Sequence, residues 1–117
     1  MDPALAKLRE KAAAARAKGQ HKKALEAYQA LVTAEPDNLM HGVRVGDALV
    51  SLGRLTEALE TYERIADRYA ADGQLVRAVS VLKIVLKLNP ERTASGERLA
   101  ALYSLRGLAT VAHEAVV

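Results

Sequence analysis

Apolar residues recur every three or four positions over most of the chain. In the first segment Leu5, Leu8, Ala12 and Ala15 follow this spacing, with charged residues between them. Residues three or four apart lie on the same face of a helix, so this pattern is typical of amphipathic helices. The pattern predicts an all-α chain of about seven helices. Their expected ranges are 4–18, 21–34, 38–52, 55–71, 75–88, 91–105 and 108–117.

Glycines and prolines mark the ends of these expected helices. Gly19, Gly53, Gly73 and Gly107 each follow a helical segment, where glycine adopts a positive φ at little cost. Pro36 and Pro90 also follow helical segments, and the residue before a proline is kept out of the α region. We therefore expect a helix to end at each of these positions.

The same spacing of small and large residues follows each of the four glycines. An alanine stands five residues after the glycine, and a larger apolar residue stands four residues after the alanine. These pairs are Ala24 with Tyr28, Ala58 with Tyr62, Ala78 with Leu82, and Ala112 with Val116. A small residue lets two helices approach closely, and the larger neighbour on the same face fills the space beside the contact.

This recurrence resembles the tetratricopeptide repeat, a 34-residue helical hairpin with an A-x3-F pattern in its second helix. The resemblance covers nearly the whole chain. It implies a right-handed α-solenoid of helical hairpins, forming a single domain over residues 1–117. The repeats would be 5–38, 39–72, an overlapping 59–92 and a truncated 93–117.

One interval departs from the repeat. Gly53 and Gly73 lie 20 residues apart, whereas the other neighbouring glycines of the series are separated by 34. The helix expected over 55–71 must therefore serve as the second helix of one repeat and the first helix of the next. We expect a register break near residues 70–75. The helix expected over 75–88 is apolar almost all round, which favours a buried, central position over an exposed groove for a partner helix.

Charge is concentrated at the amino-terminal end. The net charge is +3, but residues 1–23 carry seven basic and two acidic side chains. Lys7, Lys11 and Lys18 share one face of the first helix, either as an ordinary solvated face or as a patch for an acidic peptide or a phosphate backbone. Single-stranded nucleic acid needs aromatic stacking platforms. The four tyrosines are expected at packing positions instead, so an acidic protein partner is favoured over nucleic acid.

The residues that could carry catalysis show no catalytic pattern. The chain has no cysteine, its three histidines lack the spacing of metal ligands, and no phosphate-binding glycine loop is present. Glu57, Glu60, Glu63 and Asp67 gather on one helix, and we interpret them as partners of neighbouring arginines rather than as paired catalytic carboxylates. The sequence predicts no enzyme activity, no metal and no cofactor.

The resemblance implies a non-catalytic scaffold or adaptor that binds a partner peptide or helix in the groove lined by the first helix of each repeat. Ala13 stands where the subgroup that grips chaperone tails needs an asparagine, so that ligand is disfavoured. The composition looks bacterial, and we expect a cytoplasmic protein with no membrane insertion. The expected partner-binding residues, which face outward on the first helices, are Arg9, Arg16, Met40, Val43, Arg44, Asp47, Glu97, Arg98 and Ala101.

The last repeat stops in mid-helix at Val116 and Val117. Repeat arrays need a polar capping element to cover their last apolar face. Two expectations remain open: the chain is a piece of a longer protein, or its C-terminal helices pair with those of a second copy.

Overall fold

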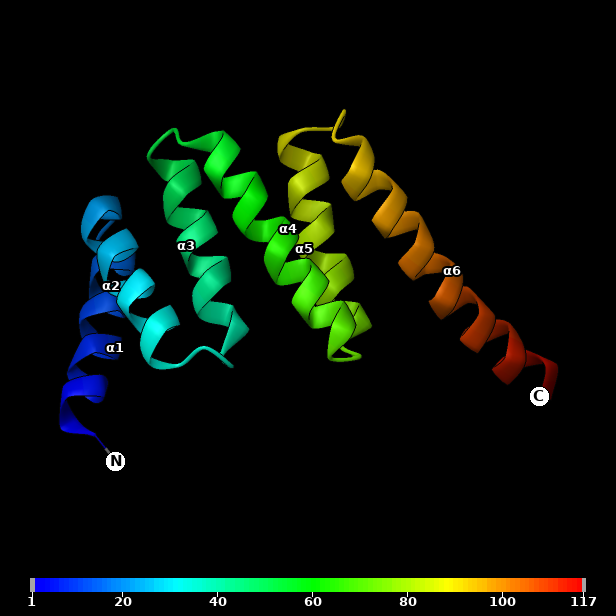
Figure 1. Cartoon of the computed structure of the whole chain (residues 1–117), viewed down its shortest axis with the longest axis horizontal. Coiled ribbons are helices and arrows are strands. Elements are labelled where there is room, and N and C mark those ends of the chain that lie inside the picture. Colours follow the sequence, from blue (N-terminus) through cyan, green and yellow to red (C-terminus); the bar gives the residue numbers. More distant parts are fainter. Residues whose placement is uncertain (1, 117) are drawn as a thin grey trace. The chain divides into compact units, whose positions relative to one another are not determined.

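The computed structural model describes residues 2–116, with side chains as far as Leu105. Within this part every regular element is a helix, the helices are joined by short turns, and no strand forms (Figure 1). The helices are α1 (Pro3–Ala17), α2 (His21–Ala34), α3 (Leu39–Ser51), α4 (Leu55–Ala71), α5 (Leu75–Leu88) and α6 (Thr93–Val116). Their number is one below the seven expected because the last two predicted helices form the single helix α6. Gly107 lies inside α6, so the prediction that it ends a helix is wrong.

The other three glycines end helices as predicted. Gly19, Gly53 and Gly73 have φ values of 68°, 76° and 79°. After α3 the Gly53 N–H donates to the Val50 carbonyl at 3.0 Å, and the Arg54 N–H donates to the Leu49 carbonyl at 2.9 Å. This pair of bonds is the Schellman motif, which satisfies the last carbonyls of a helix and reverses the chain.

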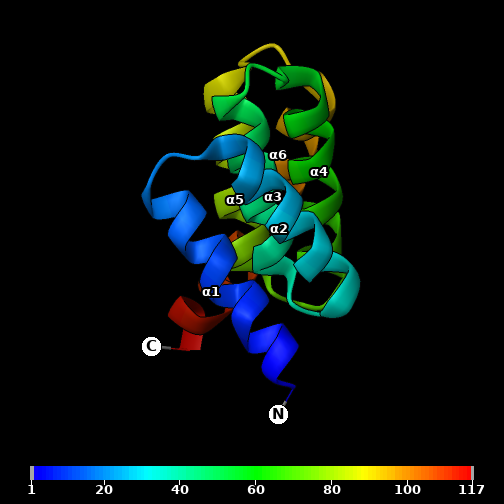
Figure 2. The same cartoon turned by 90° about the vertical axis from the view of Figure 1, so that its left-hand side faces the viewer.

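The chain divides into two compact units, and each is described by itself. Unit 1 extends to Ile65 and unit 2 begins at Ala66, so α4 contributes its first part to unit 1 and its last part to unit 2. In unit 1, α2 packs between α1 and α3 (Figures 1 and 2). The connecting turns are short, so consecutive helices run antiparallel as helical hairpins. The repeat boundaries and the register break near residues 70–75 stay predictions.

The core of unit 1 depends on small residues at helix contacts. Ala24 and Ala58, expected at such contacts, are 3% and 0% exposed. On α3, Gly46 lies against the Tyr62 ring of α4, and a Cβ atom there would stand 2.5 Å from Tyr62 Cε1. Gly42 meets Ile65 in the same way. The two glycines let α3 and α4 approach more closely than any residue with a side chain would allow.

Unit 2 consists of the end of α4 with α5 and α6. Five of the fourteen residues of α5 are buried, namely Ala78, Val79, Val81, Leu82 and Val85, whereas Val76 is 63% exposed. The expectation of a buried, central helix is therefore confirmed for one face of α5 only. Tyr103 on α6 was expected at a packing position but is 42% exposed, with the Lys83 ammonium 5.6 Å from its ring centre. That prediction is wrong because Tyr103 directly follows the buried Leu102 and is turned about 100° away from it around the helix. Among the described residues, no helix combines the length and the apolar character needed to cross a bilayer.

Candidate functional site

The expected binding residues of unit 1 lie on α1 and α3. Arg9 and Arg16 are exposed and, at seven residues apart, share one face of α1. On α3, Met40 is 38% exposed, while Arg44 and Asp47 are half-buried. These five residues were expected to face outward, and none of them belongs to the core.

Val43 is the exception, because it is only 8% exposed. The expectation that it faces outward is wrong. Helix α3 packs against α2 on one side, and Gly42 and Gly46 bring α4 against it on another. Only a narrow stripe of α3 therefore remains open, and Val43 falls outside that stripe.

A pocket of about 130 Å³ brings three of the expected residues together. Arg16 reaches it from α1, and Arg44 and Asp47 reach it from α3. Helix α2 contributes His21 and Tyr28, and Ser51 stands at the end of α3. The remaining lining residues are Ala24 and Ala48. We call this pocket the α1–α3 pocket.

Asp47 is held on both carboxylate oxygens. The Tyr62 hydroxyl donates to Asp47 Oδ1 at 2.6 Å. The Arg44 guanidinium lies on the other oxygen, with Nη1 3.4 Å from Oδ2. Burial, together with the hydrogen bond to the Asp47 carboxylate, raises the pKa of Tyr62, so this hydroxyl keeps its proton and remains a donor. Tyr62 therefore fixes the orientation of the acidic side chain in the pocket.

Arg16 has no internal partner of this kind. Within the part of the chain that the structure describes, its guanidinium makes no hydrogen bond and no ion pair. A guanidinium carries five N–H donors in a planar fork that matches a carboxylate. The α1–α3 pocket thus contains a cation whose donors are free for a ligand.

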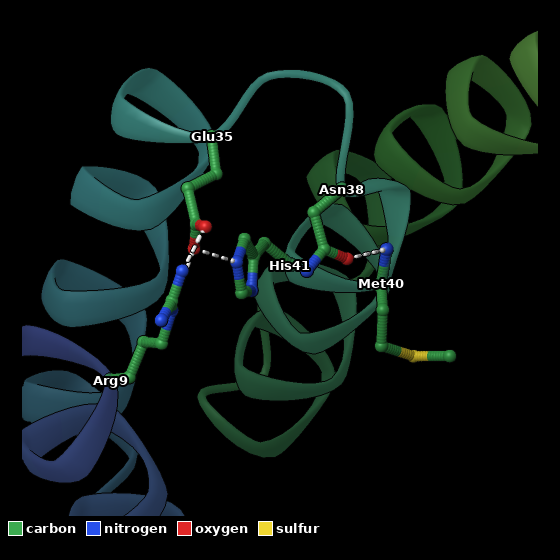
Figure 3. A network of polar contacts seen from close by, with 5 residues as sticks. All are labelled: Arg9, Glu35, Asn38, Met40 and His41. Atoms are coloured by element: carbon green, nitrogen blue, oxygen red, sulfur yellow. Dashed lines mark hydrogen bonds and ion pairs between the residues drawn. The ribbon is translucent and has the colours of Figure 1, made fainter. Parts of the chain in front are cut away.

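A second polar cluster joins three helices of unit 1 (Figure 3). Glu35, at the end of α2, accepts a hydrogen bond from Arg9 Nε at 3.0 Å and contacts His41 Nε2 at 2.9 Å. A second guanidinium nitrogen of Arg9 also pairs with Glu35. The hydrogen bonds from Arg9 and His41 lower the pKa of Glu35 to about 2. We call these residues the Arg9–Glu35–His41 cluster.

This cluster changes the role expected for Arg9. Its guanidinium is already engaged with Glu35, so it is less available to a partner than that of Arg16. Sequence reasoning did not find the cluster because Arg9 and Glu35 are 26 residues apart and meet only when α1 and α2 pack. Because the Glu35 carboxylate contacts both Arg9 and His41, the cluster connects α1, α2 and α3.

In unit 2 the expected residues Glu97, Arg98 and Ala101 are all exposed on α6. Arg98 Nε lies 3.4 Å from Asp67 Oδ1 on α4. Arg98, Ala101 and Asp67 line a pocket of about 170 Å³, whose other lining residues are Ala66, Ala70, Leu82 and Leu102. Glu97 does not line it. This pocket is apolar apart from one ion pair.

Two of the four acidic side chains gathered on α4, Glu57 and Asp67, pair with arginines, as interpreted from the sequence, whereas Glu60 forms no ion pair with a described residue. Glu57 pairs with Arg54 at 2.7 Å, and Asp67 pairs with Arg98. The pairing with Arg54 lowers the pKa of Glu57, which is the opposite of what a general acid at neutral pH requires. Among the described residues, no three acidic or histidine side chains converge in a way that could hold a metal ion.

Comparison with known proteins identifies the class of this chain. The family model for the tetratricopeptide repeat matches residues 9–73, which is more than half of the chain. The chain therefore belongs to the tetratricopeptide repeat family, as the resemblance in its sequence implied. Proteins of this family are generally protein–protein interaction modules and are typically non-catalytic.

Two solved structures align with most of this chain. The NMR structure of the first TPR domain of the human RPAP3 protein aligns with a TM-score of 0.45 and 20% identity, covering 91% of this chain and 93% of that one. The crystal structure of the MamA protein aligns with a TM-score of 0.41 and 20% identity, covering 92% of this chain and 66% of that one. No curated protein matches the sequence.

Proposed function

We propose that this chain is a non-catalytic adaptor that binds a segment of a partner polypeptide on the surface of unit 1 formed by α1 and α3. The observation that carries the proposal is the α1–α3 pocket, where Arg16, Arg44 and Asp47 meet in an open hollow. Family membership supports binding to a protein rather than to a small molecule. We define the α1–α3 surface as Arg9, Arg16, Met40, Arg44 and Asp47.

The positive charge of the amino-terminal end favours an acidic partner. Lys7 and Lys11 on α1 and Lys18 at its C-cap are exposed and form no ion pair within the described part of the chain. They lie on the face of α1 opposite to Arg9 and Arg16, outside the α1–α3 surface. Together with Arg16 they make the amino-terminal helix basic. A complementary acidic segment would be attracted to this helix and oriented before it docks.

Two further expectations remain part of this proposal. We keep the cytoplasmic location and the bacterial origin suggested by the sequence. We also keep Glu97, Arg98 and Ala101 of α6 as contacts for a partner in unit 2, where the neighbouring pocket is apolar and suits an aliphatic side chain. No finding supports the alternative of nucleic acid contacted through the lysines of α1.

The proposal is tested by selecting peptides from a random displayed library with the whole chain as bait. Peptides that bind are then titrated in solution by fluorescence anisotropy. Exchanging Arg16 for Glu should weaken their binding at least tenfold, because an attractive contact becomes repulsive. The matched control is Arg64→Glu on α4, an exposed arginine outside the α1–α3 pocket that receives the same change of charge.

Two results would contradict the proposal. One is a set of selected peptides whose affinity falls equally in the Arg16 and Arg64 variants, which would show only a response to net charge. The other is tight, sequence-independent binding of oligonucleotides that falls steeply with salt and is lost when Lys7, Lys11 and Lys18 are neutralised. That second result would favour nucleic acid as the ligand.

A further inference from the structure

We infer that the α1–α3 pocket is an anchor for one side-chain carboxylate, of Asp or Glu, from the bound polypeptide. The donors are the guanidinium groups of Arg16 and Arg44 and the hydroxyl of Tyr28. The inference rests on the proposed function for the source of the carboxylate, since it takes the ligand to be part of a peptide. It adds the chemistry by which that peptide is held.

Tyr28 supplies the first observation. It is 8% exposed and lines the pocket, yet its hydroxyl forms no hydrogen bond with any described residue. No side-chain nitrogen or oxygen in the described part is both sealed from solvent and unpaired. The Tyr28 hydroxyl is therefore accessible from the pocket. The hydroxyl of a buried tyrosine normally donates a hydrogen bond. The partner is supplied by a ligand in the pocket.

The charges supply the second observation. The pocket is lined by two guanidinium groups and one carboxylate, that of Asp47. Asp47 is shared between Arg44 and Tyr62 and forms no ion pair with Arg16. Two guanidinium groups against one carboxylate leave one positive charge in excess. A single carboxylate balances this charge, whereas a phosphate group with nearly two negative charges would leave the pocket negative.

The size and lining of the pocket fit the same ligand. One water needs about 10–15 Å³ of such space, so a pocket of about 130 Å³ is large enough for a carboxylate with the methylene groups that carry it. Ala24 and Ala48 provide an apolar wall and are 3% and 6% exposed. Methylene groups beside the alanines and carboxylate oxygens beside the arginines would each meet a complementary surface.

Tyr62 is a positioning residue that acts on Arg44 through Asp47. Only one of the five N–H donors of Arg44 faces Asp47, at the rather long distance of 3.4 Å. The others remain for a ligand. Because Tyr62 holds Asp47 in place, Asp47 in turn limits how far the Arg44 side chain can move. A guanidinium restrained in this way loses less conformational entropy when it binds a carboxylate.

The test uses two small compounds that differ only in charge. N-acetylglutamate N-methylamide carries a side-chain carboxylate, and N-acetylglutamine N-methylamide is its neutral analogue. Each is titrated at constant ionic strength into the isotope-labelled chain, and chemical shifts are followed at the Arg16 Nε–H and at the Ala24 and Ala48 amides. We expect saturable shifts at these groups with the glutamate compound and none with the glutamine compound.

Variants separate a defined anchor from general attraction to a basic surface. Arg16→Gln should weaken binding of the glutamate compound about tenfold, and Tyr28→Phe about threefold or more, since hydrogen bonds to charged groups are the stronger class. Arg64→Gln and Tyr103→Phe are the matched controls, because both side chains lie outside the pocket, and both should leave the affinity unchanged. Arg16 is exposed and forms no hydrogen bond or ion pair with a described residue, so its variant remains informative if Tyr28→Phe disturbs the fold.

Three results would overturn the inference. They are equal shifts with both compounds, unchanged affinity in Arg16→Gln, and binding of the N-methylamide of N-acetylphosphoserine more than tenfold tighter than that of the glutamate compound. The two proposals fail separately. Peptides that bind the α1–α3 surface without needing an acidic residue would keep the proposed function and remove the anchor. A glutamate compound that binds as expected, with no peptide selected, would keep the anchor and remove the proposed function.

Discussion

Exchanging Gly46 for alanine should destabilise unit 1 because the added methyl group has no room. The new Cβ would lie 2.5 Å from Tyr62 Cε1 and 2.7 Å from Tyr62 Cζ, whereas carbon atoms in contact prefer about 3.5 Å or more. The Tyr62 ring cannot simply move aside. It is 2% exposed, and its hydroxyl is bonded to Asp47 at 2.6 Å.

The expected size of the effect follows from three contributions. Overpacking a core contact costs about 1–3 kcal/mol. Displacing the ring would also break its hydrogen bond to a carboxylate, a class worth about 1.5–3 kcal/mol. Replacing glycine by alanine within a helix stabilises the helix by about 1 kcal/mol, which offsets part of this loss. We expect a net loss of about 2–4 kcal/mol in the free energy of unfolding, or a fall of about 10 °C in Tm.

Urea denaturation followed by circular dichroism measures this loss, and two other glycines serve as controls. Gly96 lies in α6, and a Cβ added to it would have no atom within 4 Å, so Gly96→Ala should stabilise the chain by about 0.5–1 kcal/mol. At Gly42 the nearest atom is the terminal Cδ1 of Ile65, which can rotate away, and the loss should be intermediate. A Gly46→Ala variant as stable as the wild type, beside a stabilised Gly96→Ala, would refute the close α3–α4 contact.

Three other predictions address the polar groups and the assembly. The pairing of Glu35 with Arg9 and His41 lowers its pKa to about 2. The stability that this pairing contributes is therefore complete above about pH 4.5 and is lost as the pH falls toward 2. Tm should fall over this pH range, and Glu35→Gln should make Tm depend less on pH. Tyr62→Phe removes the donor to Asp47 and should cost about 1.5–3 kcal/mol in urea unfolding, whereas an unchanged midpoint would mean that this bond contributes nothing. If the C-terminal helices pair with a second copy, light scattering should give twice the mass of the chain at high concentration, and a constant monomer mass would exclude that pairing.

Features that depend on local spacing were predictable from the sequence. The positive φ of Gly19, Gly53 and Gly73 follows from their place after helical segments. The burial of Ala24 and Ala58 follows from a pattern that repeats after those glycines. Both depend on residues within one or two turns, so the helical period is sufficient to find them.

Features that depend on how helices face one another were not predictable in this way. Val43 on α3 was expected to be exposed. Its side chain is buried because α2 and α4 cover α3 on two sides. The free hydroxyl of Tyr28 is equally invisible in a sequence, where the residue matches a packing position of the repeat. Gly107 has the same spacing as the helix-ending glycines, but the helix continues through it.

The central claim is that a partner polypeptide binds over the α1–α3 pocket, and site-specific photo-crosslinking tests it most directly. Ser51 borders the pocket and Ser80 is an exposed serine of α5 outside it, so each is replaced in turn by the photoreactive p-benzoylphenylalanine. A selected peptide should attach to the chain labelled at position 51 and not to the chain labelled at position 80. Attachment only at position 80, or equally at both, would contradict the account.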